Sequence, residues 1–262
     1  MKYGFIGCGN MGGALAKALT QNTTDVCIAD QYCNVQALAA QMGCCWGTNE
    51  EAACSQRVFL AVKPNVVASV LESLRPVLWE KKPLLISMAA GVSIAQLESW
   101  IGFPLPIIRI MPNTPAAVGK GMILYCTNAL VQEADLADFL KDMSKAGRFD
   151  QLDEKLIDAG SALSGCGPAY MYMFLEAMAD GAVACGLPRA KAYTYAAATM
   201  AGAAEMVLYS GTHPGALKDA VCSPGGSTIA GVKALEENAF RGAVMDCIAA
   251  AYQKTLDLGK GK

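Results

Sequence analysis

The sequence has no apolar run long enough to cross a membrane and no excess of charge of either sign. Its longest apolar stretches are interrupted by glycine, proline or a charge well before the roughly 20 residues that a bilayer requires. Lys and Arg number 21 against 23 Asp and Glu, for a formal net charge of -2. This balance supplies no basic surface for a polyphosphate backbone. We therefore expect no membrane span, no signal peptide and no nucleic-acid partner.

Metal ligands in a recognisable arrangement are also missing. His213 is the only histidine, and the 11 cysteines include no C-x-x-C pair. Zinc-like ligand spacing is thus absent, and we expect no metal site. We expect the cysteines to be free and mostly buried thiols. Such thiols are typical of a reducing compartment, so the sequence predicts a cytoplasmic protein.

Charged residues are scarce as well, at 17% of the 262 residues, whereas hydrophobic residues reach 53%. The mean hydropathy is +0.30, which is high for a chain that exposes its whole surface to water. The length allows one large or two smaller cores, and two unequal domains are expected. Some of the apolar surface is expected to be buried between subunits.

Short β-type runs alternate with helical stretches in the first half of the chain. The predicted strands are Tyr3–Ile6, Val26–Ala29, Val58–Val62, Leu84–Ser87 and Ile107–Ile110. Stretches with helical periodicity include Gly13–Thr20 and Val66–Leu74. The alternation predicts an α/β fold, with a Rossmann-type parallel sheet domain over residues 1–152 and helices on both faces of the sheet.

The amino-acid composition changes from about Asp153 onward, where Ala, Met and Leu dominate. Long helical stretches are predicted over Ala169–Ala184, Arg189–Tyr209 and Ala239–Leu258. Residues 153–262 are therefore expected to form an all-helical C-terminal dimerisation domain, because small residues on several faces let helices of two copies pack closely. A helical domain that packs only within one monomer is the alternative.

A glycine-rich turn follows the first predicted strand. Its residues are Ile6, Gly7, Cys8, Gly9, Asn10, Met11 and Gly12, a G-x-G-x-x-G pattern that opens a helix. Gly7 permits the tight turn, Gly9 lets a pyrophosphate approach the backbone, and Gly12 lets helix and strand pack closely. The helix N-terminus faces the phosphates. In this strand-to-helix context the pattern predicts a dinucleotide cofactor.

Asp30 ends the second predicted strand, 18 residues after Gly12. An acid at about this spacing binds the ribose 2′-hydroxyl, which favours NADH over NADPH. Neighbouring Gln31, Tyr32 and Asn34 supply no arginine for a 2′-phosphate. A helix N-cap or a solvated acid is the alternative.

Four further segments complete a pattern that extends over essentially the whole chain. They are Ala61–Pro64 (AVKP), Arg109–Pro115 (RIMPNTP), Ser164–Tyr170 (SGCGPAY) and Ser223–Gly231 (SPGGSTIAG). Together with the glycine-rich turn, and in this order, they resemble the signature segments of pyrroline-5-carboxylate reductases. The resemblance implies hydride transfer from NADPH or NADH to the cyclic imine of 1-pyrroline-5-carboxylate, giving L-proline. It also implies a homodimer assembled into a larger ring such as a decamer.

Cofactor contacts are expected at three further turns, and the resemblance implies those at residues 61–64 and at Asn113. Ala61, Val62, Lys63 and Pro64 would lie along the cofactor, and Ala89, Ala90 and Gly91 are small enough to leave room for the nicotinamide. Lys63 as a plain solvated lysine and residues 89–91 as an ordinary tight turn are the alternatives. Asn113 would contact the cofactor from a stiff loop, rather than a helix, between two prolines. An Asn that satisfies its own loop backbone is the alternative.

Two more positions follow from the resemblance. Asn49 would lie near the adenosine ribose, although helix capping explains an Asn there equally well. Ser223, Gly225, Gly226, Ser227 and Thr228 precede a helical run, so their N–H groups gather at a helix start that can bind a carboxylate. The resemblance implies that this turn receives the substrate carboxylate and that the Thr228 hydroxyl, as the catalytic group, reaches the ring nitrogen. A capped turn without a ligand is the alternative.

Two other functions compete with imine reduction. A β-hydroxyacid dehydrogenase also joins a Rossmann-type domain to a helical one, but it needs a catalytic lysine in G-x-G-x-x-x-K and an Asn three residues later. Gly165 and Gly167 match, whereas Met171 and Phe174 occupy the Lys and Asn positions. A non-catalytic dinucleotide sensor is the third possibility, and a turnover assay separates it from an enzyme.

Overall fold

The computed structural model describes residues 1–31 and 34–259, so Tyr32, one of the residues beside Asp30, lies outside the described residues. The chain divides into two compact units. The first contains Met1–Pro168 together with the chain from Ala251 onward, and the second is Ala169–Ala250.

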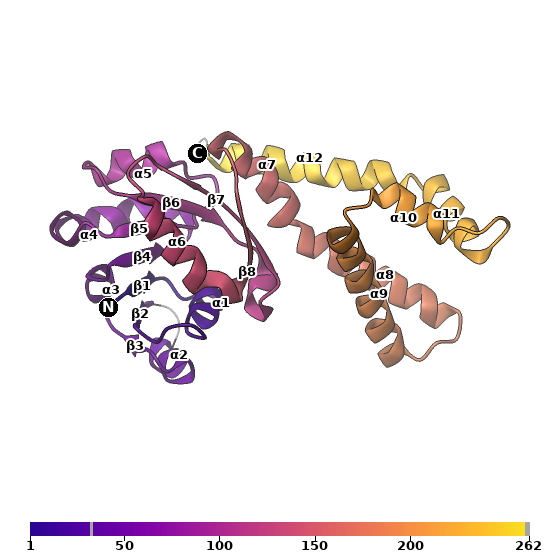
Figure 1. The fold of residues 1–262 in the computed structure, drawn as a ribbon, viewed down its shortest axis with the longest axis horizontal. Coiled ribbons are helices and arrows are strands. Elements are labelled where there is room, and N and C mark those ends of the chain that lie inside the picture. Colours follow the sequence, from indigo (N-terminus) through magenta and orange to yellow (C-terminus); the bar gives the residue numbers. More distant parts are fainter. Residues whose placement is uncertain (32–33, 260–262) are drawn as a thin grey trace. The chain divides into compact units, whose positions relative to one another are not determined.

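The first unit is built on one eight-stranded sheet (Figure 1). Its strands are β1 (Tyr3–Ile6), β2 (Val26–Ala29), β3 (Cys45–Trp46), β4 (Arg57–Leu60), β5 (Leu84–Ser87), β6 (Ile107–Met111), β7 (Gly121–Thr127) and β8 (Gly147–Gln151). The order is β3-β2-β1-β4-β5-β6-β7-β8, and every neighbouring pair is parallel except β6 with β7. The first six positions follow the strand order of a dinucleotide-binding Rossmann sheet.

Helices cover both faces of this sheet. They are α1 (Asn10–Leu19), α2 (Val35–Met42), α3 (Asn49–Ala53), α4 (Val67–Lys81), α5 (Ile94–Ile101), α6 (Glu133–Asp142) and α7 (Glu154–Ser164), with 3-10 helices η1 (Pro64–Val66), η2 (Thr114–Val118) and η3 (Met143–Ala146). One core joins the sheet to α3, α4, α5 and α7, and the other joins it to α1, α2 and α6. The predicted α/β fold class is confirmed.

The strand predictions differ from the structure in two respects. β4 ends at Leu60 rather than at Val62, because the partner strands β1 and β5 end beside it at Ile6 and Ser87, and η1 then begins at Pro64. The sequence patterns also do not predict β3, β7 or β8. β8 is half-exposed and carries charged residues, so it has little of the apolar pattern by which strands are found.

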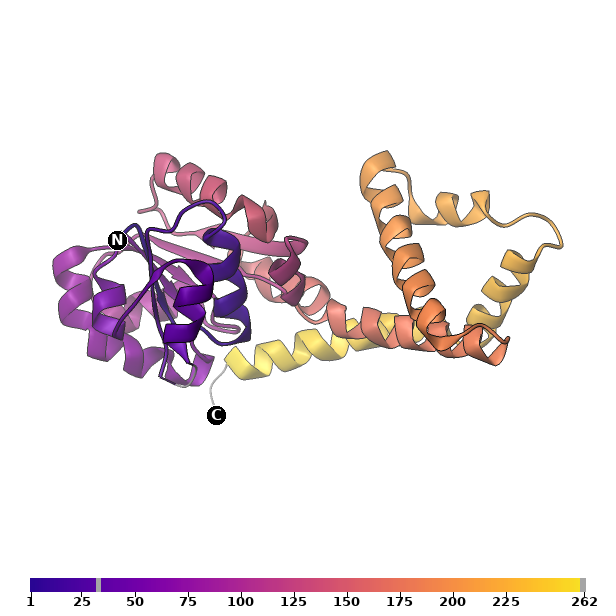
Figure 2. The same ribbon diagram turned by 90° about the horizontal axis from the view of Figure 1, so that it is seen from below.

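The second unit is helical throughout. It contains α8 (Gly167–Ala184) beyond Pro168, α9 (Arg189–Ser210), α10 (Pro214–Ala220), α11 (Ser227–Glu237) and the part of α12 (Phe240–Gly259) up to Ala250. In Figure 2, α9 runs at a steep angle to α8 rather than along it. The rings of Phe174 and Phe240 pack 5.7 Å apart and join α8 to α12. The predicted helical C-terminal region is confirmed.

A single copy leaves most of this unit's apolar side chains in contact with water. Among its described residues, only three alanines are buried, whereas Tyr209 is 87% exposed, Met245 71% and Met173 70%. Apolar surface on this scale is typical of an interface between subunits. Within the described part of the chain, no helix combines the length and the apolar character that a bilayer span needs.

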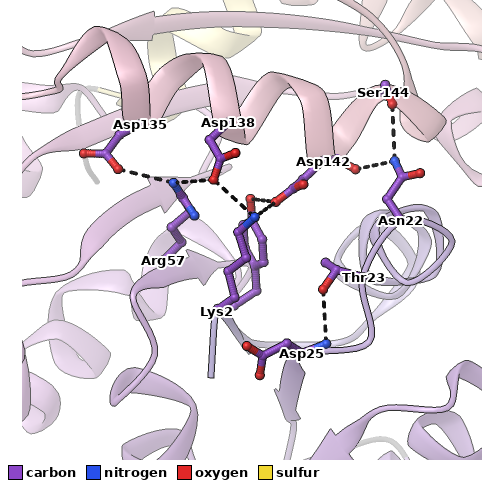
Figure 3. A network of polar contacts seen from close by, with 10 residues as sticks. Lys2, Asn22, Thr23, Asp25, Arg57, Asp135, Asp138, Asp142 and Ser144 are labelled. Carbon is purple, nitrogen blue, oxygen red and sulfur yellow. Dashed lines mark hydrogen bonds and ion pairs between the residues drawn. The ribbon is translucent and has the colours of Figure 1, made fainter.

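A charged network fixes α6 against the amino ends of β1 and β4 (Figure 3). Lys2 pairs with Asp142 at 2.6 Å and with Asp138 at 3.2 Å. Arg57, which is buried, reaches Asp138 at 3.1 Å. The Tyr3 hydroxyl donates to Asp142 at 2.8 Å. Burial, followed by this hydrogen bond, raises the pKa of Tyr3. The network lies at the opposite edge of the sheet from the glycine-rich turn.

We expect this network to make stability depend on pH. The hydrogen bond from Lys2 lowers the pKa of Asp138, so the folded state favours the ionised carboxylate more than the unfolded state does. The contribution is present above the ordinary pKa of about 3.9 and is lost as the pH falls through the lower folded value. The free energy of unfolding of Asp138→Asn, measured in urea over a pH series, should therefore fall less on acidification than that of the parent.

The matched control is Asp25→Asn. Its carboxylate, drawn in Figure 3, makes no ion pair within the described residues. The control should follow the parent's pH dependence. Identical acid slopes for the Asp138 variant and the parent would contradict the assignment of this contribution to Asp138.

Candidate functional site

The strand register aligns four turns at the carboxyl edge of the sheet. Ile6 lies beside both Ala29 and Leu60, and Leu60 lies beside Ser87. The chain therefore leaves β1, β2, β4 and β5 at the same level. The strand order reverses between β1 and β4, and ligands of open α/β sheets bind outside the carboxyl ends at this reversal.

The glycine-rich turn is shaped by contacts that exclude side chains at two of its glycines. Gly7 has φ +96°, and a Cβ there would lie 2.6 Å from the carbonyl oxygen of Ala61. A Cβ at Gly12 would overlap the carbonyl oxygen of Gly7 and lie 2.9 Å from the Ala61 Cβ. Both glycines therefore allow α1 to pack closely against the turn that follows β4, as predicted from the motif.

Gly9 differs from the other two because it borders open space. A Cβ there would meet no atom within 4 Å among the described residues. Gly9 is the N-cap of α1, and within the described chain no side chain caps this helix. The first N–H groups of α1 therefore point out of the helix without an intrahelical acceptor. Open space above a bare helix N-terminus fits the pyrophosphate of a dinucleotide.

Asp30 lies against this turn. Its Oδ2 accepts a hydrogen bond from the N–H of Cys8 at 2.6 Å, and the residue is half-buried. Its predicted alternative role as a helix cap is wrong, since the N-cap of α2 is Asn34, whose side chain accepts from the N–H of Ala37. The structure thus places the acid beside the glycine-rich turn, at the end of β2.

The turns after β4 and β5 lie at the same edge. Lys63 is exposed and is the N-cap of η1, which Pro64 begins. After β5, Ala89 is buried, Ala90 and Gly91 are half-buried, and Gly91 has φ +72°. The turn is closed by the N–H of Val92, which donates to the carbonyl of Ala89 at 3.3 Å. Because these residues are small, their side chains project little beyond the carboxyl edge of the sheet.

Asn113 is buried and its amide has two partners in the first unit. Its Oδ1 accepts from the N–H of Met122 at 2.9 Å, and its Nδ2 donates to the carbonyl of Ser164 at 2.9 Å. It therefore satisfies the backbone of β7 and α7 rather than that of its own loop. The prediction of a loop without helix is wrong from Thr114 onward, where η2 begins, because the fixed φ of Pro115 suits the first turn of a helix.

Asn49 is the first residue of α3, after the short strand β3. Helix capping does not explain it, since Thr48 is the N-cap and forms a capping box with Glu51. The Asn49 side chain is half-buried and makes no hydrogen bond within the described residues. It is available to a ligand at the carboxyl edge.

In the second unit, Ser223–Gly226 form a turn that leads into α11. Gly225 has φ +67°, and the N–H of Gly226 donates to the carbonyl of Ser223 at 3.0 Å. Gly226 is the N-cap of α11, and no side chain caps this helix within the described chain. Thr228 is exposed, and its hydroxyl makes no hydrogen bond among the described residues. The helix start therefore offers backbone N–H groups and one hydroxyl to an anionic ligand.

One group of charged residues in the first unit could not be predicted from the sequence. Arg109 on β6 is 2% exposed and pairs with Glu154 at 3.3 Å and with Asp158 at 2.7 Å, both on α7. Burial raises the pKa of the neighbouring Cys126 thiol to about 11, so Cys126 adds no charge. No local pattern links these residues, because the partners of Arg109 are 45 and 49 residues away. Among the described residues, no cluster of His, Cys, Asp or Glu suits a metal ion.

Comparison with family models finds two matches. Residues 154–258 match the family described as pyrroline-5-carboxylate reductase dimerisation. Residues 2–91 match the family described as NADP oxidoreductase, coenzyme F420-dependent. The two segments coincide with the helical region and with the part of the sheet that carries the glycine-rich turn.

Full-length relatives are similar to the chain from end to end. Pyrroline-5-carboxylate reductase of Escherichia coli K12 is 43% identical, with 99% of this chain and 98% of the relative covered. The Pisum sativum enzyme of that name is 40% identical, with 97% and 95% covered. A crystal structure of Plasmodium falciparum pyrroline carboxylate reductase with NADP bound matches with a TM-score of 0.89 at 34% identity, covering 99% of this chain and 98% of that one.

Proposed function

The chain belongs to the pyrroline-5-carboxylate reductase family, and on that premise we propose that it reduces the cyclic imine of 1-pyrroline-5-carboxylate to L-proline with NAD(P)H. It is an oxidoreductase that acts on a C=N bond. The observation that carries the proposal is the open backbone cradle at Gly9, which stands at the carboxyl edge of a Rossmann sheet in a chain of this family.

The residues that we propose to bind the cofactor lie along one edge of the first unit. They are Ile6, Gly7, Cys8, Gly9, Asn10, Met11, Gly12, Asp30, Asn49, Ala61, Val62, Lys63, Pro64, Ala89, Ala90, Gly91 and Asn113. The N–H groups at the start of α1 bind the pyrophosphate, and Asn49 lies on the ribose side. When bound, the nicotinamide supplies the hydride. The small residues of the turn after β5 give its ring room.

The substrate residues that we propose are in the second unit. Ser223, Gly225, Gly226 and Ser227 form the turn that receives the carboxylate, and the remaining N–H groups in the first turn of α11 compensate its charge without an arginine. The Thr228 hydroxyl hydrogen-bonds the ring nitrogen and relays a proton to it from water. Protonation makes the imine carbon strongly electrophilic, so the enzyme has mainly to hold the reacting groups in place.

The chain forms a homo-oligomer, and its dimerisation segment covers residues 154–258. We propose that dimers assemble into a larger ring such as a decamer. The exposed apolar side chains of the second unit support association, since one copy cannot bury them. We also propose a cytoplasmic location, which the free thiols of Cys45, Cys54 and Cys185 support, although these are exposed rather than buried as the sequence predicted.

Oxidation of NADPH or NADH in the presence of pyrroline-5-carboxylate tests the function. Turnover with stoichiometric formation of proline is expected. Cofactor binding without any oxidation would indicate the dinucleotide sensor instead. Oxidation of the cofactor by a 3-oxo acid, and not by the imine, would indicate the β-hydroxyacid dehydrogenase.

Asp30 is proposed to favour NADH over NADPH. Its carboxylate lies at the glycine-rich turn, where a negative charge suits a ribose hydroxyl and repels a 2′-phosphate. We expect Asp30→Ser to lower the ratio of kcat/KM for NADH to that for NADPH by about tenfold, which is the weight of one charge-assisted hydrogen bond. The measurement is steady-state kinetics with each cofactor.

The matched control is Asp25→Ser, which removes an exposed acid at the other end of β2. It should leave the ratio unchanged. An unchanged ratio in Asp30→Ser would remove the assignment of cofactor choice to Asp30.

A further inference from the structure

Glu154 connects three elements of the first unit. It is the first residue of α7, and its Oε1 accepts a hydrogen bond from the N–H of Ile94 at 2.7 Å. The same oxygen lies 3.3 Å from Nη1 of Arg109, on β6. Nη2 of Arg109 pairs with Asp158, one turn further along α7. One carboxylate therefore joins α7, β6 and the start of α5.

The start of α5 continues directly from the turn after β5. Gly91 is followed by Val92, whose N–H closes the turn onto Ala89, and then by Ser93, the N-cap of α5. Ser93 and Gln96 form a capping box, which uses the N–H groups of both residues. The N–H of Ile94 has its acceptor outside this turn and helix, on Glu154.

We propose that Glu154 is a positioning residue for hydride transfer. By binding the N–H of Ile94 and the guanidinium of Arg109 together, it fixes the turn of residues 89–93 relative to β6. This inference rests on the proposed function, which assigns the nicotinamide to the turn of residues 89–91. A carboxylate beside the N-terminus of α5 is also favoured by the helix dipole, which strengthens the link.

Asp158 shows what a purely structural role would look like. It pairs with the same guanidinium as Glu154, and both carboxylates are partly exposed. Removing either one deprives the buried Arg109 of one partner and should destabilise the fold. Only Glu154 of the two also binds the start of α5. The two residues thus form a matched pair that separates stability from positioning.

The experiment compares Glu154→Ala, Glu154→Gln and Asp158→Ala in the full-length enzyme. Gln keeps an oxygen for the N–H of Ile94 but loses the charge. We expect Glu154→Ala to lower kcat about tenfold with KM values within about threefold of the parent, because small misplacements of reacting groups reduce turnover steeply. Glu154→Gln and Asp158→Ala should keep kcat within about threefold of the parent. The fluorescence of bound NADPH, which reports on the surroundings of the nicotinamide, should change only in Glu154→Ala.

Two results would overturn the inference. Equal kcat losses in Glu154→Ala and Asp158→Ala would assign both to stability alone. A loss in Glu154→Gln as large as in Glu154→Ala would show that charge, and not the bond to Ile94, matters. If Glu154→Ala does not fold, Glu154→Asp replaces it, since the shorter acid keeps the charge but draws back from Ile94, and the same loss is expected. Absence of turnover in the parent would instead reject the proposed function.

Discussion

Replacing Gly9 by Ala should weaken NADPH binding by about 100-fold while leaving the fold intact, a loss of roughly 2.7 kcal/mol of binding free energy. The added methyl group meets no protein atom within 4 Å among the described residues, so the folded chain has room for it. The backbone angles of Gly9, φ -64° and ψ -164°, are open to any residue. The methyl group would instead occupy the space through which a pyrophosphate reaches the backbone. Isothermal titration calorimetry with NADPH measures the loss.

Gly12→Ala is the matched control, because its Cβ meets the protein itself. It would overlap the Gly7 carbonyl, so α1 must shift away from the turn that follows β4. We expect a loss of roughly 1–3 kcal/mol in the free energy of unfolding, as for other overpacked sites. Gly9→Ala should lower stability less than Gly12→Ala, because its Cβ meets no protein atom within 4 Å among the described residues and only the weaker N-cap preference of Ala opposes it. Parent-like NADPH affinity in Gly9→Ala would show that the phosphates lie elsewhere.

The contrast between these two glycines illustrates what sequence patterns can predict. The G-x-G-x-x-G spacing assigns each glycine a role, because the pattern is local and the chemistry of a strand-to-helix turn is shared by many proteins. Gly7 has the positive φ that its role requires, Gly9 has the open space, and Gly12 has the close packing. Likewise, buried strands such as β2 and β5 are found from uninterrupted apolar runs.

Other features depend on contacts between distant residues and leave no local pattern. Asn113 bonds Met122 and Ser164, and Glu154 bonds Ile94, which is 60 residues earlier. The sequence shows that positions 113 and 154 are polar, but it does not show which residues their side chains bond. The short strand β3 and the exposed strand β8 are missed for a related reason, since their pairing partners and not their own residues define them.

Replacing Thr228 by Ala should lower kcat about 100-fold, the lower range for loss of a group that transfers a proton, and leave cofactor affinity unchanged. The hydroxyl is exposed and makes no hydrogen bond within the described residues, so the substitution removes no such bond within the protein. We therefore expect the melting temperature of the variant to match that of the parent, so that a lower kcat reports on the reaction. Thr228 lies in the second unit and the glycine-rich turn in the first, which separates the chemistry from cofactor binding along the sequence.

Thr228→Ser and Thr228→Val distinguish the hydroxyl from the shape of the side chain. Ser keeps the hydroxyl and should retain kcat within about tenfold, whereas Val keeps the shape and should lose as much as Ala. Steady-state kinetics with pyrroline-5-carboxylate and NADPH give kcat and KM for each variant. A rise in KM alone would place the hydroxyl on the substrate without a part in proton transfer, because an interaction lost equally from substrate and transition state leaves kcat unchanged. Full activity in both Val and Ala would mean that water protonates the ring nitrogen without help from this residue.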